Sequence, residues 1–477
     1  MTAILAIDQG TSGTKAIVVD DADGTVAIAE ETICPAYLAG GGVEQDPHEL
    51  LDSVLEAGRR AISAAGRPID CVALANQGET VLAWDPRTGA PLSPAIVWQD
   101  RRAESVCREL TAHAARIARR TGLVLDPYFS APKMAWLRRN VTREGVVTTT
   151  DTWLVHQLTG EFVTDAATAS RSLILDLDSV TWDGELADLF GLEEERLPRV
   201  VAGDEIVGTT RAFGGDIPVA GLIVDQQAAL LAENCLEPGT AKCTYGTGAF
   251  LLANTGRNAV RSAAGLTTSV AWRIAGQTPY CVDGQVYTVA SAVRWLRDLG
   301  LIRSATDLDA VAAADAGGAL CVPAFAGLAA PWWAPQAAAS FTGLTLATRR
   351  EHLVLAVLQG VAAQVAELCS LVAADLGRPL TRLRADGGLT QSATLMQAQA
   401  DIGQIPVDIY PHAHATPLGA AALARRALDP TLSLEEAVGD WQPATVYEPR
   451  WSPDRAEEFR TTWAQAAAAC ADKGEHT

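Results

Sequence analysis

The sequence predicts an α/β protein of two domains that face each other across a cleft. The chain has 477 residues, which is too long for one hydrophobic core. Two strand–turn–strand segments with glycine- and threonine-bearing tips occur about half a chain apart, near residues 4–20 and 240–253. This repeat predicts two related domains. The apolar run 219–224 ends in Asp225, and open α/β sheets bind ligands beyond the carboxyl ends of their strands.

The predicted elements follow in the order that an open α/β sheet requires. They are strands over 4–8 and 16–20 joined by a turn over 9–15, a helix from Asp46, strands over 71–75, 219–224, 240–245 and 249–253, a helix over 350–376 stopped by Gly377, a strand over 383–386, a helix through Met396 and Ala400, and a helix from Thr416. The helix start at Asp46 rests on an acid at the N-cap followed by proline at the first helical position.

We place the domain border just after the second hairpin, which gives an N-terminal domain of residues 1–254 and a C-terminal domain of residues 255–477. The uncharged stretch 316–348 is long enough to cross a bilayer, but three prolines and four glycines interrupt any helix there. We therefore expect buried loops and short strands in that stretch, and no membrane span.

Composition excludes several classes of protein. The formal charge of −20 argues against nucleic acid or an anionic membrane as a partner. The nine cysteines form no CxxC pair, which favours reduced core cysteines in a cytoplasmic protein over disulfides or a zinc site. The N-terminus has no basic segment and meets an acid at Asp8, so we expect no signal peptide.

Two hairpin tips and one strand end have the composition of phosphate-binding loops. The first tip, Asp8–Lys15, combines backbone N–H groups, three hydroxyls and one cation, although an ordinary turn explains it equally well. The second tip, Gly246–Gly248, favours phosphate binding, because a nucleotide between two domains needs contacts from each. The segment Asp386–Gly388 suits either a phosphate or a tight strand-to-helix turn.

Asp225 has two interpretations, a general base or a cap for the helix that follows it. Taken alone, the capping role is the better one. The chain contains neither the P-loop pattern nor the glycine pattern of a dinucleotide-binding strand. His412 and His414 are too few to define a metal site. Any chemistry must therefore depend on carboxylates and on the glycine-bearing loops.

Together these segments resemble the FGGY family of carbohydrate kinases. Residues 128–140 are similar to the first family signature, and residues 339–344 with 352–359 are similar to the second. The resemblance extends from Asp8 to about Gly419. It implies the duplicated ribonuclease H-like ATPase fold of actin, Hsp70 and hexokinase with an interdomain cleft, ATP and Mg²⁺ as cofactors, a small polyol or sugar as substrate, and a homodimer or homotetramer.

Five stretches point to the glycerol kinase branch of that family. They are Asp8–Thr11, Ile96–Gln99 with Arg101 and Arg102, Asp126–Ser130, Asp225–Ala229 and Tyr245–Gly248. The implied activity is ATP-dependent phosphoryl transfer to a terminal hydroxyl of a small polyol, as from glycerol to glycerol 3-phosphate.

The resemblance also implies roles for individual residues. Asp225 would remove a proton from the attacking hydroxyl, and Asp8 would help to hold Mg²⁺. The implied polyol pocket comprises Gly78, Glu79, Trp98, Tyr128, Asp225, Gln226 and Phe250. The implied nucleotide site comprises Thr11, Ser12, Thr14, Lys15, Thr247, Gly248, Ala290, Arg294, Gly388 and Ser392.

The chain departs from the family pattern in the polyol pocket. Gly78 stands where the pattern Asn-Gln-Arg-Glu has arginine. Either the substrate is larger than glycerol, such as a tetritol, a pentitol, xylulose or ribulose, or another arginine reaches the pocket. The residues at Lys15, Ala290, Arg294 and Ser392 also differ from those usual near the nucleotide. A non-catalytic, nucleotide-dependent regulator on the same fold is the alternative from another class, against which the presence of both Asp8 and Asp225 argues.

Overall fold

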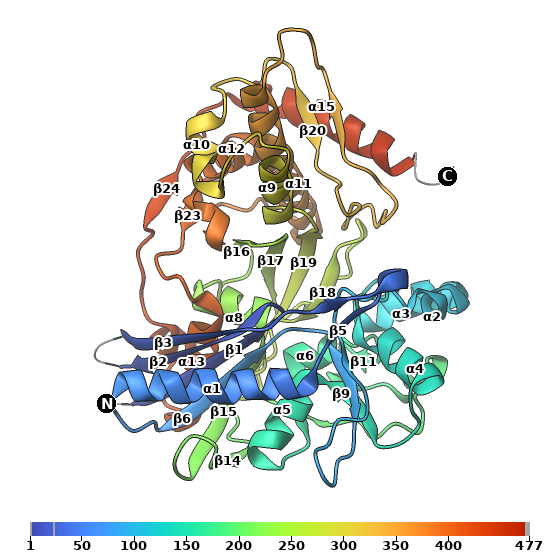
Figure 1. The fold of residues 1–477 in the computed structure, drawn as a ribbon, viewed down its shortest axis with the longest axis vertical. Coiled ribbons are helices and arrows are strands. Elements are labelled where there is room, and N and C mark those ends of the chain that lie inside the picture. Colours follow the sequence, from blue (N-terminus) through green and yellow to red (C-terminus); the bar gives the residue numbers. More distant parts are fainter. Residues whose placement is uncertain (1, 22–23, 473–477) are drawn as a thin grey trace.

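The computed structural model describes residues 2–21 and 24–472. It contains two large β-sheets, one in each half of the chain, and helices pack around both (Figure 1). The N-terminal sheet lies in the lower part of the view and the second sheet rises from it toward the upper part. This is the mixed α/β architecture that the sequence predicts.

The first sheet has six strands in the order β14-β15-β6-β1-β2-β3. Their bounds are β1 Ala3–Gly10, β2 Gly13–Asp20, β3 Gly24–Thr32, β6 Cys71–Asn76, β14 Gly208–Thr210 and β15 Ile217–Val224. The second sheet has seven strands in the order β18-β19-β17-β16-β22-β23-β24. Their bounds are β16 Ala241–Tyr245, β17 Ala249–Gly256, β18 Thr267–Val270, β19 Tyr280–Val286, β22 Leu383–Asp386, β23 Val407–Ile409 and β24 Thr445–Tyr447.

The two sheets repeat the same arrangement of five strands. In the first sheet, β3, β2 and β1 pair antiparallel, and β6 and β15 continue in parallel. In the second, β19, β17 and β16 pair antiparallel, and β22 and β23 continue in parallel. The internal duplication predicted from the two hairpins is therefore confirmed at the level of the whole sheet.

Smaller strands and the helices complete the structure. A five-stranded sheet contains β4 Ala36–Tyr37, β5 Val43–Gln45, β8 Ala95–Ile96, β7 Val81–Trp84 and β9 Val146–Thr149, and two-stranded pairs are β10 Val163–Asp165 with β13 Arg199–Val201, β11 Leu175–Asp176 with β12 Thr181–Trp182, and β20 Leu320–Val322 with β21 Ser340–Thr342. The helices are α1 Pro47–Ala65, α2 Glu104–Glu109, α3 Ala114–Thr121, α4 Ser130–Asn140, α5 Thr150–Thr159, α6 Ala166–Ser170, α7 Gly184–Leu189, α8 Asp225–Ala232, α9 Ala290–Asp298, α10 Leu308–Val311, α11 Arg350–Leu376, α12 Ala393–Gly403, α13 Ala415–Leu428, α14 Leu434–Val438 and α15 Pro453–Asp472.

The predicted helix boundaries agree well with the observed ones. The Asp46 side chain accepts a hydrogen bond from the N–H of His48 at 2.8 Å, so it caps α1 as expected. Helix α11 ends before Gly377, whose φ of +65° is a left-handed conformation that glycine adopts without strain. Among the described residues, α11 is also long and apolar enough to cross a bilayer, but 83% of its most apolar window is buried inside the molecule. It is a core helix here.

The turn of the first hairpin is shorter than predicted. Strands β1 and β2 pair as far as Gly10 and Gly13, so only Thr11 and Ser12 form the turn, where the sequence predicted one over residues 9–15. Polar residues near the tip thus continue the strand ladder, since pairing with β6 and β3 supports both strands to their ends. In contrast, the stretch 316–348 does form loops and two short strands, as predicted, but residues 342–347 are exposed where buried loops were expected.

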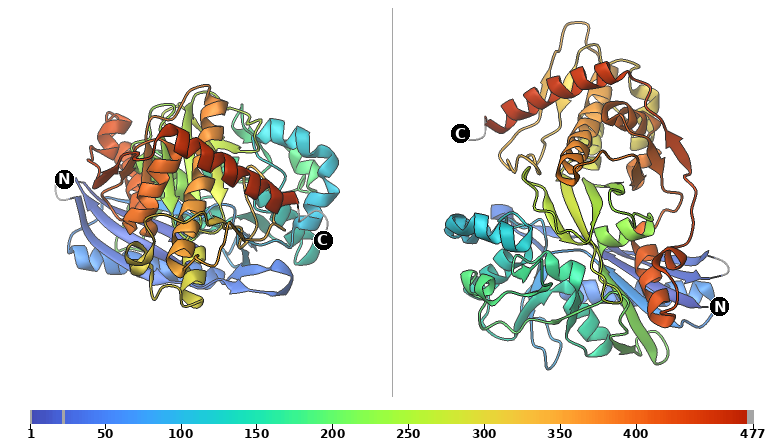
Figure 2. Two further views of the ribbon diagram at one scale, coloured as in Figure 1. Left: turned by 90° about the horizontal axis from the view of Figure 1, so that it is seen from above. Right: turned by 180° about the vertical axis from the view of Figure 1, so that it is seen from behind.

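Helix α13 returns from the C-terminal half of the chain to the first sheet. Its alanines, from Ala420 to Ala424, are buried in one core cluster with Ile4 and Ala6 of β1. Gly419 permits this approach, because a Cβ there would lie 2.0 Å from the carbonyl oxygen of Ala228 on α8. Seen from behind, α13 lies beside the strands of the first sheet (Figure 2). The packing therefore does not follow a division of the chain at residue 254, which falls inside β17.

Candidate active site

Polar residues of the first sheet gather where three parallel strands end together. On β1, Asp8 lies opposite Ala75 of β6, and on β15 Val224 lies opposite Asn76. The segment 76–79 and Asp225 follow these strands directly. The fold thus brings Asp8, Glu79 and Asp225 to one edge of the sheet, as expected for an open α/β sheet.

Asp8 and Asp225 are close enough to influence each other's ionisation. Burial and the negative charge of Asp225 raise the pKa of Asp8 from 3.8 to about 7, although the charge of Lys15 opposes the rise. Burial also raises the pKa of Asp225, and the Gln226 N–H, Lys242 and Arg171 oppose that rise. Both side chains keep partial exposure. The pair therefore forms a small acidic centre in contact with solvent.

The residues of this centre could hold Mg²⁺ only together with ligands from outside the protein. Among the described residues, none donates a hydrogen bond to the Asp8 carboxylate, and no group of three or more His, Cys, Asp or Glu residues could hold a metal by itself. Mg²⁺ commonly binds one or two carboxylates together with water and phosphate oxygens. Asp8 and Asp225, two neighbouring carboxylates with raised pKa values, fit that pattern.

Asp225 is held at the first turn of α8, where it accepts a hydrogen bond from the N–H of Gln226 at 2.7 Å. Beside it, the fully buried Lys242 of β16 donates to Gln226 Oε1 and to Thr244 Oγ1, each at 2.7 Å. Lys242 therefore orients the Gln226 amide and places a positive charge near Asp225. This contact also links the two sheets.

Glu79 is buried and has a φ of +56°, an unusual backbone conformation for a residue with a side chain. Its Oε1 accepts a hydrogen bond from Arg171 Nε, and Arg171 also donates to Asp283 Oδ1 at 3.0 Å and to the Tyr128 hydroxyl at 3.4 Å. Burial raises the pKa of Glu79, and the positive charge of Arg171 opposes the rise. An arginine outside the predicted set thus reaches the implied pocket.

Three aromatic rings form one wall of the implied polyol pocket. The Trp98 ring packs edge-on against Tyr128 at 5.6 Å and against Phe250 at 6.2 Å between centroids. Trp98 belongs to the first half of the chain and Phe250 to β17 of the second sheet, so the wall spans both halves. The backbone around Tyr128 is held by the buried Lys133 side chain, whose Nζ donates to the carbonyls of Pro127, Tyr128 and Phe129 at 2.5–2.8 Å.

The nucleotide residues predicted on the first hairpin differ in their observed surroundings. The Thr11 hydroxyl accepts from Trp98 Nε1 at 2.8 Å, which joins the tip to the aromatic wall. Lys15 lies opposite Asp8 in the strand ladder, and its ammonium forms an ion pair with Glu30 at 3.2 Å. The Thr14 hydroxyl instead lies 2.6 Å from Ser53 of α1 and is buried. Its observed partner is therefore in the core between the sheet and α1.

The second hairpin tip lies against the start of α9 and the turn after β22. The N–H of Ala290 donates to Gly246 O at 3.1 Å, and Val289 N–H donates to Thr247 O at 3.0 Å. Glycine is required at Gly248, where a Cβ would lie 2.5 Å from the carbonyl oxygen of Val286. Gly387 is similarly close to Tyr245, which places the neighbouring Gly388 beside this tip. Thr247, Gly248, Ala290 and Gly388 thus form one cluster.

Two other predicted nucleotide residues lie at the edge of this cluster. Arg294 is exposed on α9, four residues after Ala290 of the cluster. Ser392 caps α12 by accepting from Leu395 N–H at 3.2 Å, and it donates to Asp309 at 2.7 Å. The Ser392 hydroxyl is thus already engaged within the protein.

Sequence reasoning missed Arg171, Lys242 and Asp283. Arg171 follows a run of small residues without any local motif, and its partners lie 92 and 112 residues away in the chain. Lys242 did carry a signal, because it is one of only four lysines and lies within an apolar strand. A lysine in such a position is typical of a buried, hydrogen-bonded cation.

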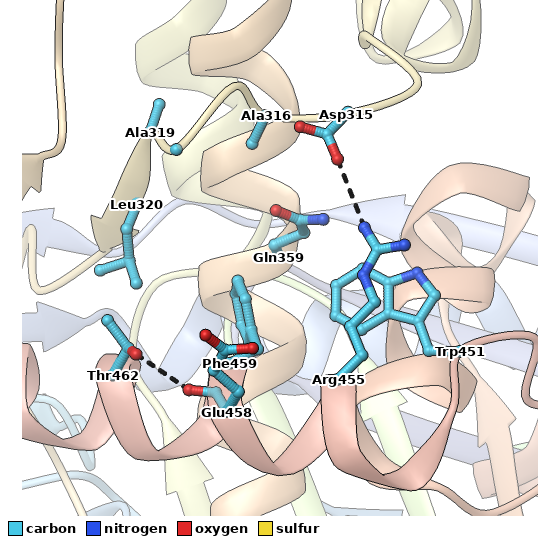
Figure 3. Close-up of a pocket in the computed structure, with 11 residues that line it drawn as sticks. Asp315, Ala316, Ala319, Leu320, Gln359, Trp451, Arg455, Glu458, Phe459 and Thr462 are labelled. Atoms are coloured by element: carbon cyan, nitrogen blue, oxygen red, sulfur yellow. Dashed lines mark hydrogen bonds and ion pairs between the residues drawn. The ribbon is translucent and has the colours of Figure 1, made fainter.

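A separate cavity of about 440 Å³ lies far from these residues, between α11, α15 and the segment before β20 (Figure 3). In it, Arg455 stacks on the Trp451 ring at 4.1 Å and pairs with Asp315 at 3.3 Å. Gln359 of α11 lies at its floor. None of the predicted site residues lines it.

Comparison with known proteins identifies the family of this chain. The family model described as "FGGY family of carbohydrate kinases, N-terminal domain" matches residues 3–232, and the corresponding C-terminal domain model matches residues 241–428. Glycerol kinase of Alkalilimnicola ehrlichii is 42% identical over 98% of each chain, and that of Thermus brockianus is 41% identical over 98% of each.

Solved structures show the same relationship. The crystal structure of Plasmodium falciparum glycerol kinase with ADP superposes with a TM-score of 0.92 at 31% identity and covers 98% of each chain. A xylulose kinase from Lactobacillus acidophilus superposes at 0.88 with 23% identity, which shows the common fold alone. Because both domain models match in order along a chain with the duplicated sheets, this protein belongs to the FGGY family of carbohydrate kinases.

Proposed function

We propose that this chain transfers the terminal phosphoryl group of ATP to a terminal hydroxyl of a small polyol, with glycerol as the preferred substrate. The observation that carries the proposal is the pair Asp8 and Asp225 at one strand edge, beside an aromatic wall drawn from both halves. The names of the full-length relatives, glycerol kinases at about 40% identity, support the same substrate.

Asp225 is the proposed general base. It accepts the proton of the terminal hydroxyl as that oxygen bonds to the γ-phosphorus, and the bond from phosphorus to the leaving oxygen of ADP breaks. Arg171 and Lys242 favour the ionised carboxylate, which offsets part of the cost of its burial. General-base catalysis of this kind typically contributes about 10²- to 10⁴-fold.

The polyol would lie with its C–H groups against Trp98 and Phe250, and its hydroxyls would meet Glu79, Gln226 and Tyr128. Lys242 fixes the Gln226 carbonyl, and the Gln226 amide also donates to Asp225, which leaves one N–H for the substrate. Such preorganised polar groups in an otherwise apolar pocket position the attacking oxygen with little reorganisation.

ATP would contact both hairpin tips, through Thr11, Ser12 and Lys15 on one side and Thr247, Gly248 and Gly388 on the other. The remaining residues proposed for this site are Thr14, Ala290, Arg294 and Ser392. Mg²⁺ would be held at Asp8, where it neutralises negative charge on the phosphates. The observed hydrogen bonds favour structural roles for the Thr14 and Ser392 hydroxyls.

The pocket geometry at Gly78 favours glycerol over a larger substrate. A Cβ at Gly78 would lie 3.0 Å from Val224 Cγ2, so the apolar side chain of Val224 already occupies part of the space beside this glycine. The absence of arginine at this position therefore does not simply enlarge the pocket. A tetritol, a pentitol or a ketose such as xylulose or ribulose is the alternative substrate class, and a regulator without turnover is the alternative from another class.

A coupled ADP-release assay tests these alternatives directly. It compares glycerol, erythritol, threitol, xylitol, ribitol, xylulose and ribulose at equal ATP and Mg²⁺. We expect glycerol to give the highest kcat/KM. A higher value for any four- or five-carbon substrate would replace glycerol with that substrate, and no ADP release above the background with any of them would favour the regulator. Omission of Mg²⁺ should abolish turnover in the same assay.

We also propose that the protein acts in the cytoplasm as a homodimer or homotetramer, without nucleic acid or membrane partners. All nine cysteines lie within the described residues and are free thiols, and eight of them are buried. The formal charge of −20 disfavours binding to anionic polymers. Light scattering at several protein concentrations would determine the oligomeric state.

A further inference from the structure

Arg171 is the most highly connected side chain near the proposed base. It follows α6 and is 5% exposed. Its guanidinium bonds to Glu79 after β6, to Asp283 on β19, and to the hydroxyl of Tyr128. Glu79 belongs to the first half of the chain and Asp283 to the second sheet. The position of Arg171 is therefore fixed from both sides of the site by buried carboxylates.

These bonds leave part of the guanidinium available. Arginine has five N–H donors in a planar fork, and the contacts with Glu79, Asp283 and Tyr128 use three of them. Two N–H groups, one on each terminal nitrogen, thus remain for a ligand. Glu79 also has an unused hydrogen-bonding atom, because no described residue donates to its second oxygen, Oε2. Unused donors beside an unused acceptor match the two hydrogen-bonding functions of an alcohol.

Gly78 presents no side chain to this region, and Val224 compensates for it. Val224 is buried, and its Cγ2 would lie 3.0 Å from a Cβ on Gly78. Apart from the chain neighbours Gln77 and Glu79, no other described heavy atom lies within 4 Å of that position. A Cβ at residue 78 thus meets one neighbour, Val224. The two residues are complementary in volume.

We propose that Arg171 is the guanidinium that binds substrate hydroxyl groups in this pocket, and that Val224 occupies the volume beside Gly78 and keeps the pocket small. The inference rests on the proposed function, because it assigns the hydroxyl-binding group of the same site. The ligand class is a polyol with adjacent hydroxyls, which the Arg171 fork and Glu79 Oε2 bind together. Arg171 is then a specificity-determining residue as well as the link between Glu79 and Asp283.

The first test combines variants that lack the Arg171 guanidinium with substrates that lack one hydroxyl group. Wild type, Arg171→Lys and Arg171→Met are assayed with glycerol, with 1,2-propanediol, which lacks one terminal hydroxyl, and with 1,3-propanediol, which lacks the middle one. We expect Arg171→Met to lower kcat/KM for glycerol about 100-fold, as for a lost charged hydrogen bond. For the diol that lacks the bound hydroxyl, the loss should shrink to below about tenfold. Equal losses with all three substrates would overturn the inference.

Matched variants separate substrate binding from structural support. Arg171→Met/Asp283→Asn removes the unpaired charge that Arg171→Met leaves on Asp283 but not the one on Glu79, so a structural role through Asp283 predicts partial recovery of kcat/KM and a binding role predicts none. Arg138→Met is the control for loss of a buried arginine, because Arg138 pairs with Glu195 away from the site. Arg171→Lys retains a cation and serves if Arg171→Met does not fold. Its selectivity between glycerol and the diols should also fall.

The second test concerns the complementary pair. Gly78→Arg should lower kcat/KM by at least about tenfold, because overpacking against a buried side chain is costly. Gly78→Arg/Val224→Gly should recover most of that loss relative to Gly78→Arg, whereas Val224→Gly alone should shift the ratio of kcat/KM values from glycerol toward erythritol. Failure of the double variant to recover would refute the role of Val224. Wild-type turnover is measured first: if no polyol is phosphorylated, the proposed function fails, and if another polyol is best, the cycle is repeated with its deoxy analogues.

Discussion

The two sheets share one strand order but differ in the charge that they carry at their ends. In the first sheet, the ends of β1, β6 and β15 lead to Asp8, Glu79 and Asp225. In the second, the positions before its hairpin tip are Thr244 and Tyr245, and β22 ends in Asp386 before Gly387 and Gly388. The two sheets therefore share a frame, but the first places three carboxylates after its strands, whereas the second places one carboxylate beside glycines and backbone N–H groups.

The two hairpin tips differ in the same way. The first tip is bonded to the aromatic wall, because Trp98 donates to the Thr11 hydroxyl. Gln45 also donates to the Thr11 carbonyl at 2.7 Å. The second tip is joined to α9 through Thr247 and Ala290. A phosphate bound between the tips would thus contact one loop that is hydrogen-bonded to the aromatic wall and one loop that is hydrogen-bonded to the start of α9.

The largest effect should come from removing the base on the acidic side. Asp225→Asn is expected to lower kcat about 10³-fold with a small change in KM for glycerol, because the amide cannot take the proton. Asp216→Asn, at an exposed acid paired with Arg211, is the control and should retain full activity. Undiminished substrate-dependent ADP release by Asp225→Asn would show that another group is the base.

At the glycine-bearing tip of the second sheet, KM for ATP should depend on backbone shape more than on charge. At Gly248, an added Cβ would lie 2.5 Å from Val286 O, whereas at Gly246 the nearest atom would be 3.8 Å away. Gly248→Ala should therefore raise KM for ATP about tenfold, since a displaced tip loses preorganised contacts. Gly246→Ala should leave it within about twofold. Similar effects of both substitutions on ATP kinetics would contradict the assignment of the second tip to the nucleotide.

Lys242 connects the two sides, and its removal should shift a pH profile. Its charge opposes the rise in the pKa of Asp225, so Lys242→Met should raise that pKa further. The base then becomes protonated at a higher pH, and the acidic limb of kcat/KM should move upward. Thr244→Val removes a hydrogen-bond partner of Lys242 without removing its charge, and it should leave the limb in place. Superimposable profiles for Lys242→Met and wild type would exclude an electrostatic role.

The smallest effect concerns the stability of the ligand-free protein. The pKa of Asp8 is about 7 in the folded chain and 3.8 in the reference state, so between these values the folded form binds more protons and stability falls as the pH rises. Asp8→Asn removes this penalty. Without Mg²⁺, its Tm at about pH 8 should exceed that of wild type by about 2 °C, and the difference should vanish near pH 4. Scanning fluorimetry measures the Tm values, and Asp52→Asn, at an exposed acid of α1, is the control. Equal Tm values for wild type and Asp8→Asn at both pH values would contradict the prediction.

Local signals allowed the sequence to predict much of this structure. The N-cap at Asp46, the stop at Gly377 and the strand ending at Val224 are encoded by neighbouring residues, and each was found where predicted. The hairpins and the strand-end acids were likewise recognisable from residue pattern. The family resemblance, which the comparisons confirm, then supplied the common fold.

Long-range packing determined what the sequence did not predict. Pattern alone could not show that α13 crosses to the first sheet, because its apolar face is suited to either half. Thr14 was indistinguishable from Thr11 by composition, yet strand alternation turns its hydroxyl toward Ser53. The hypothesis that another arginine reaches the pocket was open, but only the folded chain identifies Arg171.

The return of α13 also restricts how this protein can be divided or recombined. Within the described residues, the chain passes between the halves after α8, again after β23, and again after α14. A fragment that ends at residue 254 would lack the alanine-rich helix that covers β1 and β15, and its sheet would present an apolar face to water. Exchange of the nucleotide-side half with that of a relative should therefore leave residues 415–438 with their original sheet, so that a functional chimera has three junctions in place of one.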